Sequence, residues 1–446
     1  MISIITETIK YLMILLMTVY TFRSFTYFTL KTEVKKNKSS LKQNIAMFLF
    51  HFTAYLTCYL MTKNNAFLLF YGCQLLFFII VLSFNRFAYP KASRILTSHM
   101  CFMLSLGFIM LTRLSYELAL RQFAIAIIGS ILSWIIPFVM LKMKSLRKMA
   151  WIYGVIGILM LLIVMVFGDT SYGAKLSISI MGFSFQPSEF VKIVYVFFLA
   201  AIFEHRTDFK QVIKASIMAA IHVLILVFSK DLGGALIFFV AYTIMLYVAT
   251  KKPIYLIGGL LGGSASAMVA YRLFAHVQTR VTAWINPWIV IDTKGYQIAQ
   301  SLFAIGTGGW FGLGLYKGMP YKIPVVEQDF IFSAISEEMG GLIAICVILI
   351  CLSCVLLFFN IGIQSKNKFY SLMAMGLGTI YGFQIFLTIG GAIKLIPSTG
   401  VTLPLVSYGG SSLFSTLFMF AIVQGLYIIK QEEGEKHEEG EKHESQ

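Results

Sequence analysis

The chain has 446 residues, of which 58% are hydrophobic and only 13% are charged, whereas soluble domains are roughly a quarter charged. Long apolar runs recur from one end to the other, so the composition excludes a soluble domain with a single anchor and predicts an all-α polytopic membrane protein. The formal net charge is +16, but most lysines and arginines fall in short segments between apolar runs, where they orient membrane proteins. We therefore expect no nucleic-acid partner.

Thirteen apolar runs are long enough to cross a bilayer, at about 20 residues for each crossing. The predicted spans cover residues 10–30, 44–62, 65–84, 95–115, 121–142, 149–167, 188–204, 211–228, 231–249, 254–274, 330–358, 370–391 and 410–429. No small-residue cleavage site follows the first run, so we expect it to be kept as a span rather than removed as a signal peptide.

Basic residues gather in every second interval between these spans, beginning with the interval after the first span. Because positive charge marks cytoplasmic loops, this alternation predicts an outside N-terminus and a cytoplasmic C-terminus. The C-terminal segment 431–446 repeats the motif EGEKHE and has no apolar residues. We predict a disordered tail there, with metal binding by His437 and His443 as the alternative.

Several familiar sites are absent from the sequence. All six cysteines lie inside apolar runs, and the CxxC pattern of Cys351 and Cys354 has no histidine or carboxylate near it, so we interpret them as small buried hydrophobic residues. There is no P-loop, HExxH motif or nucleophile elbow, which argues against ATP-driven transport. No two-fold repeat is evident, which argues against the common transporter architectures.

The longest interval between spans begins at Arg280 and contains a cluster of glycines within GTGGWFGLG (306–314). Irregular backbone near a bilayer must be buried in protein or line a wet cavity, so this interval is a candidate site. Basic residues are also unexpectedly frequent on the predicted outer side, namely Lys175, Arg280, Lys294, Lys317, Lys322 and Lys394. They indicate an anionic ligand such as a pyrophosphate, or they reflect the weaker charge bias of long loops.

Four carboxylates draw attention for their place in the sequence. Asp329 stands at the start of the predicted span 330–358, where partial desolvation favours a general base, although aspartate is also a preferred helix N-cap. Glu337 and Glu338 follow about two turns deeper, where ionisable residues are costly and often functional. Glu189 lies three residues before Lys192, on one helix face, so the two form either a structural ion pair or part of a site.

Seven blocks of the sequence resemble, in order and spacing, the signatures of the SEDS family (shape, elongation, division and sporulation), which includes FtsW, RodA and SpoVE. The blocks are QPSEFVK (186–192), KDLGGAL (230–236), INP (285–287), GYQIAQSLFAIGTGG (295–309), GLG (312–314), QDFIF with EEMG (328–340) and LIPSTGVTLPLVSYGGSS (395–412). The resemblance covers residues 95–430 and implies a ten-span core. Residues 1–94 would then be an addition of three spans, and 431–446 the tail.

The resemblance implies a peptidoglycan glycosyltransferase of the bacterial plasma membrane. Such enzymes polymerise lipid II, a disaccharide-peptide on undecaprenyl pyrophosphate, and usually work with a class B penicillin-binding protein. The essential aspartate of the family falls on Asp329, which would act as the catalytic general base. The expected substrate-binding residues are Glu189, Lys192, Arg280, Lys317, Lys322, Glu327, Lys394 and Ser407. A divalent cation, Mg²⁺ or Mn²⁺, could screen the pyrophosphate, although the sequence indicates no ligand set for it.

Some family positions differ in this chain, which indicates a divergent branch. The differences are Leu176-Ser177 for Arg-Trp, Lys230 for Pro, Thr388 for Asn, and Pro-Val-Val-Glu-Gln-Asp at 324–329 for Pro-Glu-x-His-Thr-Asp. Two rival functions stay open at the level of sequence. One is a flippase for lipid-linked precursors, and the other is a non-catalytic scaffold for a penicillin-binding protein.

Overall fold

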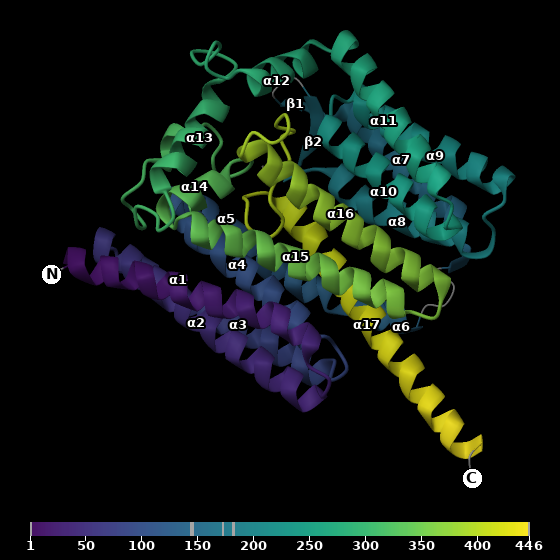
Figure 1. Cartoon of the computed structure of the whole chain (residues 1–446), viewed down its shortest axis with the longest axis horizontal. Coiled ribbons are helices and arrows are strands. Elements are labelled where there is room, and N and C mark those ends of the chain that lie inside the picture. The colour runs from purple at the N-terminus through teal and green to yellow at the C-terminus, as the bar shows by residue number, and fades with distance from the viewer. Residues whose placement is uncertain (1, 143–146, 172–173, 181–182, 445–446) are drawn as a thin grey trace. The chain divides into compact units, whose positions relative to one another are not determined.

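The structure is a computed structural model that describes residues 2–142, 147–171, 174–180 and 183–444. Helices make up most of it (Figure 1). In chain order the elements are α1 (Ile2–Thr26), η1 (Tyr27–Thr29), α2 (Glu33–Thr62), α3 (Ala66–Ala88), α4 (Arg94–Leu114), α5 (Tyr116–Ser133), α6 (Ile135–Lys142), α7 (Ala150–Phe167), β1 (Asp169–Ser171), β2 (Ala174–Ile180), β3 (Phe183–Phe185), α8 (Pro187–His205), α9 (Phe209–Phe228), α10 (Leu232–Thr250), α11 (Pro253–Leu273), α12 (Ala275–Ile285), α13 (Tyr296–Gly308), η3 (Pro320–Lys322), α14 (Ile331–Glu338), α15 (Gly341–Gln364), α16 (Lys368–Ala392) and α17 (Gly410–Glu444).

Within the described residues, twelve helical segments are long and apolar enough to cross a membrane. The predicted span 188–204 is not among these twelve, because α8 carries Glu189, Lys192 and Glu204. It is nevertheless a helix of 19 residues, about 28 Å long at 1.5 Å per residue. Every predicted span therefore corresponds to a helical segment, and the all-α polytopic fold is confirmed.

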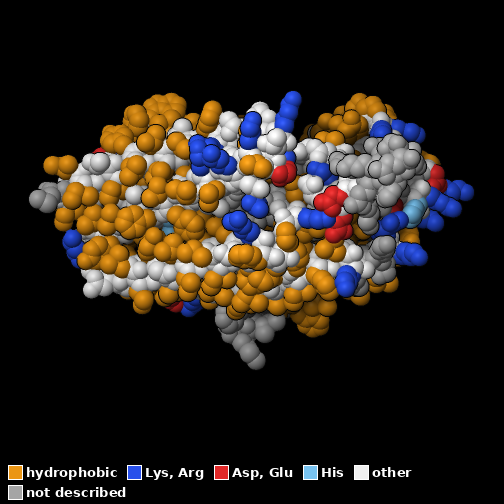
Figure 2. All heavy atoms as spheres, turned by 90° about the horizontal axis from the view of Figure 1, so that it is seen from below, with side chains coloured by type: hydrophobic (Ala, Val, Ile, Leu, Met, Phe, Trp, Pro, Cys, Tyr) orange, Lys and Arg blue, Asp and Glu red, His pale blue; other side chains and the backbone are white. Residues whose placement is uncertain are grey.

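Apolar side chains cover much of the surface seen in Figure 2. Leu69 and Leu76 of α3 are 73% and 60% exposed, and no residue of α11 is buried. In water such surface would be unfavourable, whereas in lipid it is matched to its surroundings. The chain is a multi-pass membrane protein.

One predicted span is wrong at its start. Residues 330–358 are not a single helix, because α14 ends at Glu338 and α15 begins at Gly341. Gly340 turns the chain between them with φ +94°, and a Cβ there would lie 2.4 Å from the backbone nitrogen of Gly312. Only glycine fits such a position without strain. Asp329 therefore precedes a short separate helix rather than a membrane span.

Three further segments differ from the sequence-based expectation. The helix α17 continues to Glu444, where no helix was expected; glutamate and lysine, which dominate the segment after residue 430, are good helix formers. The predicted disorder of 431–446 stays a prediction. The interval between α11 and Asp329 holds the helices α12, which contains Arg280, and α13. Between α7 and α8 an antiparallel meander β1-β2-β3 forms, with Asp169 opposite Ser177 and Ile178 opposite Phe185.

The chain packs as two compact units. The first comprises Met1–Ser130, Thr279–Cys354 and Ile385–Gly409, and the second comprises Ile131–Gln278, Val355–Gln384 and Gly410–Gln446. The predicted division at residue 94 does not coincide with a boundary of either unit, and it stays a prediction. The residues before 94 belong to the same unit as α4, α13 and α14.

Replacing Gly340 with alanine is expected to lower the free energy of unfolding by about 1–3 kcal/mol, because a side chain at positive φ is strained and would press on Gly312. Thermal unfolding of the detergent-purified protein measures the effect. Gly258→Ala in α11 is the matched control, since no atom lies within 4 Å of the added Cβ and alanine favours a helix. Unchanged melting of Gly340→Ala would contradict the strain.

Candidate active site

Three segments of the first unit meet at the candidate site: the part of α12 that carries Arg280, the stretch 398–400 and the stretch that carries Asp329. Arg280 of α12 donates a hydrogen bond from Nη1 to the carbonyl oxygen of Ser398, at 2.9 Å. A Cβ added to Gly400 would lie 3.4 Å from Nη2 of Arg280 and 3.6 Å from Oδ2 of Asp329. Gly400, at φ +75°, therefore lets the backbone come close to both side chains. The guanidinium group of Arg280 and the carboxylate of Asp329 are therefore both close to Gly400.

The surroundings of Asp329 raise its pKa to about 6. Burial is the largest cause, because a poorly solvated carboxylate disfavours the charged form. The positive charge of Arg280 opposes this effect, and the negative charge of Glu327 adds to it. The result is a half-buried carboxyl group that titrates near neutral pH, which suits a general base.

The alternative role of Asp329 as a helix N-cap is wrong. The N-cap position of α14 is occupied by Phe330, and no side chain caps the helix there. The carboxylate therefore has no structural task at the helix end that would account for its place in the sequence.

The loop that carries Asp329 is held by the segment before α17. Ser407 is 3% exposed, and its hydroxyl donates to the carbonyl oxygen of Gln328 while accepting from the backbone nitrogen of Leu403, at 2.9 Å. The backbone nitrogen of Tyr408 donates to the carbonyl oxygen of Glu327, at 2.7 Å. The hydroxyl of Ser407 therefore fixes the backbone next to Asp329, and its expected contact with substrate stays a prediction.

The predicted basic residues are dispersed. Among the described side chains of this set, Arg280 is the one whose charge acts on Asp329. Lys317 pairs with Glu7 of α1, with Nζ 2.5 Å from the carboxylate. Lys322 is exposed at the end of η3, and Lys394 is half-buried. Among the described residues neither of the last two forms an ion pair with Asp329.

Glu189 and Lys192 form a buried network in the second unit. Nζ of Lys192 lies 2.9 Å from Oε2 of Glu189 and 2.8 Å from Oε1 of Gln384. The hydroxyl of Ser415 donates to Glu189 at 3.1 Å. The two charged residues are 8% and 3% exposed, so the ion pair left open by the sequence is formed. A buried pair is costly to desolvate and needs such additional hydrogen bonds.

Glu337 and Glu338 bind the glycine-rich loop, defined here as residues 309–319. Oε1 of Glu338 accepts from the backbone nitrogen of Gly318 at 3.2 Å, and Oε1 of Glu337 accepts from that of Met319 at 2.9 Å. Arg113 of α4 donates to Glu338 at 2.9 Å. These carboxylates therefore shape the backbone around the site.

Some residues of this arrangement were not found by sequence reasoning. Arg113 was recognisable, because an arginine inside an apolar run demands a partner. Gln122 of α5 was not: its side chain donates to the carbonyl oxygen of Ser407 at 3.0 Å and accepts from the backbone nitrogen of Gly409. A lone glutamine carries no signal of a partner 285 residues away.

The described residues offer no group of three or more histidine, cysteine, aspartate or glutamate side chains that could hold a metal ion. Glu327 and Asp329 supply two carboxylates, but Arg280 lies beside them and would repel a cation. This donor set does not fit a resident metal held by the protein alone.

The fold and the site define a polytopic membrane protein with a carboxyl group of raised pKa close to a guanidinium group. The sequence profile of the FtsW/RodA/SpoVE family, described as cell cycle proteins, matches residues 94–432. The chain belongs to this family.

Known proteins similar to the chain agree with this assignment. The peptidoglycan glycosyltransferase RodA of Mycobacterium bovis is 33% identical over 372 residues, which is 77% of this chain and 79% of the relative. A solved peptidoglycan synthase complex, described as coordinating polymerisation and crosslinking, contains a chain with a TM-score of 0.67 at 23% identity, covering 76% of this chain and 98% of that chain. The crystal structure of Thermus thermophilus RodA gives a TM-score of 0.58 at 23% identity, with the same coverage.

Replacing Ser407 with alanine is expected to cost about 1–3 kcal/mol of stability, because it leaves the buried Leu403 N–H and the part-buried Gln328 carbonyl without their partner. Thermal unfolding in detergent is the measurement. Ser365→Ala is the control: that hydroxyl also binds a backbone carbonyl, 2.7 Å away, but it is half-buried at a helix end, and a change within about 0.5 kcal/mol is expected. Equal losses in both variants would contradict the special role of Ser407.

Proposed function

We propose that this chain is a peptidoglycan glycosyltransferase that polymerises lipid II, with Asp329 as the general base. The observation that carries the proposal is the half-buried carboxyl group with a pKa of about 6, held beside a guanidinium group. It occurs within the part of the chain that matches the family, whose relative in Mycobacterium bovis is named for this activity.

The geometry supports an inverting displacement. Asp329 accepts the proton of an acceptor sugar hydroxyl, the hydroxyl oxygen forms a bond to the anomeric carbon of the donor, and the bond from that carbon to the pyrophosphate oxygen breaks. The leaving lipid pyrophosphate takes the electron pair of the broken bond. Arg280 stabilises the developing negative charge by charge-assisted hydrogen bonding.

The remaining predicted residues are given roles that follow from their surroundings. Lys322 and Lys394 have no ion-pair partner among the described residues and are proposed to bind the pyrophosphate. The buried pair Glu189 and Lys192 is proposed to contribute to substrate binding, as the resemblance implies. A divalent cation, Mg²⁺ or Mn²⁺, is proposed only as a companion of the substrate pyrophosphate, since Mg²⁺ commonly binds through substrate phosphates.

We further propose that the reaction takes place at the outer face of the plasma membrane, with the N-terminus outside and the C-terminus in the cytoplasm. The alternation of basic intervals supports this orientation. A class B penicillin-binding protein is the proposed partner. The fold similarity to a chain of a peptidoglycan synthase complex supports such an assembly.

Asp329→Asn is expected to abolish glycan polymerisation, because the amide accepts no proton yet keeps the size of the side chain. The measurement is polymerisation of purified lipid II by detergent-purified protein, with Mg²⁺ and with and without the penicillin-binding protein. The control is Asp169→Asn, which makes the same chemical change at an exposed carboxylate in β1 and should leave polymerisation unchanged. The Asp169 carboxylate accepts a hydrogen bond from the backbone nitrogen of Ser179 at 2.8 Å.

Normal polymer from folded Asp329→Asn would refute the general base. No polymer from the wild type in any combination would refute the glycosyltransferase. Translocation of lipid II in proteoliposomes without polymer would then favour a flippase, and full complementation of a deletion by Asp329→Asn would favour a scaffold.

The rate is expected to depend on pH through Asp329. Since the carboxyl group works only when deprotonated, kcat/KM should fall as the pH drops through about 6, the pKa of this group. Removing the negative charge in Glu327→Gln should move this acidic limb to lower pH, because Glu327 raises the pKa. The pH profile of lipid II polymerisation by both proteins is the measurement, and an acidic limb at the same pH in both would contradict the assignment.

A further inference from the structure

The first three helices, α1 to α3, lie outside the part of the chain that matches the family. They nevertheless belong to the same compact unit as Asp329. An additional membrane segment could serve as a simple anchor, packed on its neighbours by apolar contacts alone. The contacts of α1 and α2 with α4 also include hydrogen bonds between buried polar side chains.

Four pairs of buried polar side chains join these helices to α4. Tyr20 and His99 lie 2.9 Å apart, His51 and Ser105 2.8 Å, Tyr55 and Thr112 2.8 Å, and Ser40 and Ser98 3.2 Å, each measured between the bonded atoms. Polar groups in an apolar interior must meet specific partners. A shift of α1 or α2 along α4 would break these pairs, so the joint has one register.

The N-terminal end of α1 reaches the glycine-rich loop. Glu7 forms ion pairs with Lys317, at 2.5 Å, and with Lys10, at 2.8 Å. Nζ of Lys10 also donates to the carbonyl oxygen of Gly312, at 3.3 Å. Glu7 thus holds the loop through the side chain of Lys317, and Lys10 holds it through the backbone of Gly312.

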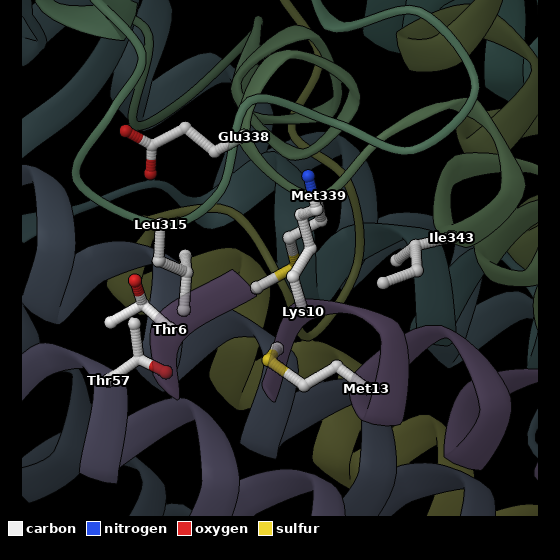
Figure 3. Close-up of a pocket in the computed structure, with 8 residues that line it drawn as sticks. All are labelled: Thr6, Lys10, Met13, Thr57, Leu315, Glu338, Met339 and Ile343. Carbon is white, nitrogen blue, oxygen red and sulfur yellow. The ribbon is translucent and has the colours of Figure 1, made fainter. Parts of the chain in front are cut away.

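A small cavity marks the same contact (Figure 3). It is lined by Thr6, Lys10, Met13, Thr57, Leu315, Glu338, Met339 and Ile343. In the close-up, Thr6, Lys10 and Met13 come from α1, and Glu338 and Leu315 lie across the cavity from them. Its volume of about 10 Å³ is room for roughly one water molecule, so the α1 surface and the loop fit closely.

The loop in turn holds the helix that follows Asp329. The backbone nitrogen of Gly314 donates to the carbonyl oxygen of Glu338 at 2.8 Å, and that of Leu313 donates to Glu337 at 3.0 Å. These two glutamates end α14, a helix of 8 residues that begins two residues after Asp329. Contacts run without a gap from Glu7 through the loop and α14 to the general base.

We propose that α1 acts as a brace for the active site, in which Glu7 and Lys10 are positioning residues that hold the glycine-rich loop and, through α14, Asp329. The role goes beyond the proposed function, on which only its kinetic readout rests. The ion pairs themselves add little to global stability, because Glu7 and Lys317 keep 40% and 29% of their side chains exposed and such pairs are weak. Their loss should therefore change the rate rather than the folding.

The first test is kinetic. Glu7→Gln should lower kcat for lipid II polymerisation by about tenfold, as misplacement of a reacting group does, with KM and the melting temperature unchanged. The control is Glu33→Gln, which removes the 2.8 Å ion pair with Lys36 in α2 and should leave kcat unchanged. The exchanged pair Glu7→Lys with Lys317→Glu should restore most of the rate. In that double variant the carboxylate introduced into the loop attracts both Lys10 and the ammonium group introduced into α1.

The second test does not depend on activity. Hydrogen exchange of the full-length protein in detergent should be faster in Glu7→Gln than in wild type at the amides of Gly314, Gly318 and Met319, and unchanged in Glu33→Gln. Wild-type exchange in Glu7→Gln would overturn the brace even if the protein makes no glycan. A loss of kcat without faster exchange, or one that the exchanged pair does not restore, would overturn it as well.

Discussion

The close approach of the glycine-rich loop to the turn at Glu337–Gly340 is the constraint on which the first unit depends. A Cβ at Gly308, the last residue of α13, would lie 2.1 Å from the carbonyl oxygen of Ser336, and one at Gly312 would lie 2.5 Å from that of Glu338. Backbone can come this near only where side chains are missing. This approach allows hydrogen bonds from loop amides to the backbone and carboxylates of Glu337 and Glu338. Arg113 forms an ion pair with the carboxylate of Glu338. The backbone on the C-terminal side of Asp329 is fixed as a result.

Asp329 itself reflects a balance between burial and charge. Complete burial without a partner would keep the carboxyl group protonated, whereas full hydration would make it too weak a base. Arg280 offsets part of the desolvation, and Glu327 offsets part of the effect of Arg280. Ser407 and Tyr408 anchor the backbone on the N-terminal side of Asp329, so the balance does not depend on a mobile loop.

The sequence predicted the features that are local. Apolar runs of sufficient length located every span, and Asp329 drew attention because a carboxylate stood beside an apolar run. Gly340, by contrast, was hidden inside that run: the break between α14 and α15 follows from its contact with Gly312 rather than from composition. Lys317 was expected at the substrate because it is basic and lies near glycines. The structure pairs it with Glu7, which is 310 residues away, and no periodicity or local motif reports such a contact. Its contact with substrate stays a prediction.

The roles of hydroxyl and amide side chains were also beyond local reasoning. Ser407 lies in a block that resembles the family signature, which suggests contact with substrate. In the structure its hydroxyl binds the backbone carbonyl of Gln328. Position in a block indicates that a residue matters, but only the fold decides whether it touches a ligand or holds a neighbour that does.

The polar joint between α4 and the first helices has a consequence for any shortened form of the chain. With those helices removed, Ser98, His99, Ser105 and Thr112 would lose partners that they now meet inside the protein, and part of their helix would face lipid. Hydrocarbon offers no replacement hydrogen bonds, so each polar side chain makes the loss of the extension more harmful. A shortened chain that lacks α1 to α3 is therefore expected to need apolar replacements on this face of α4.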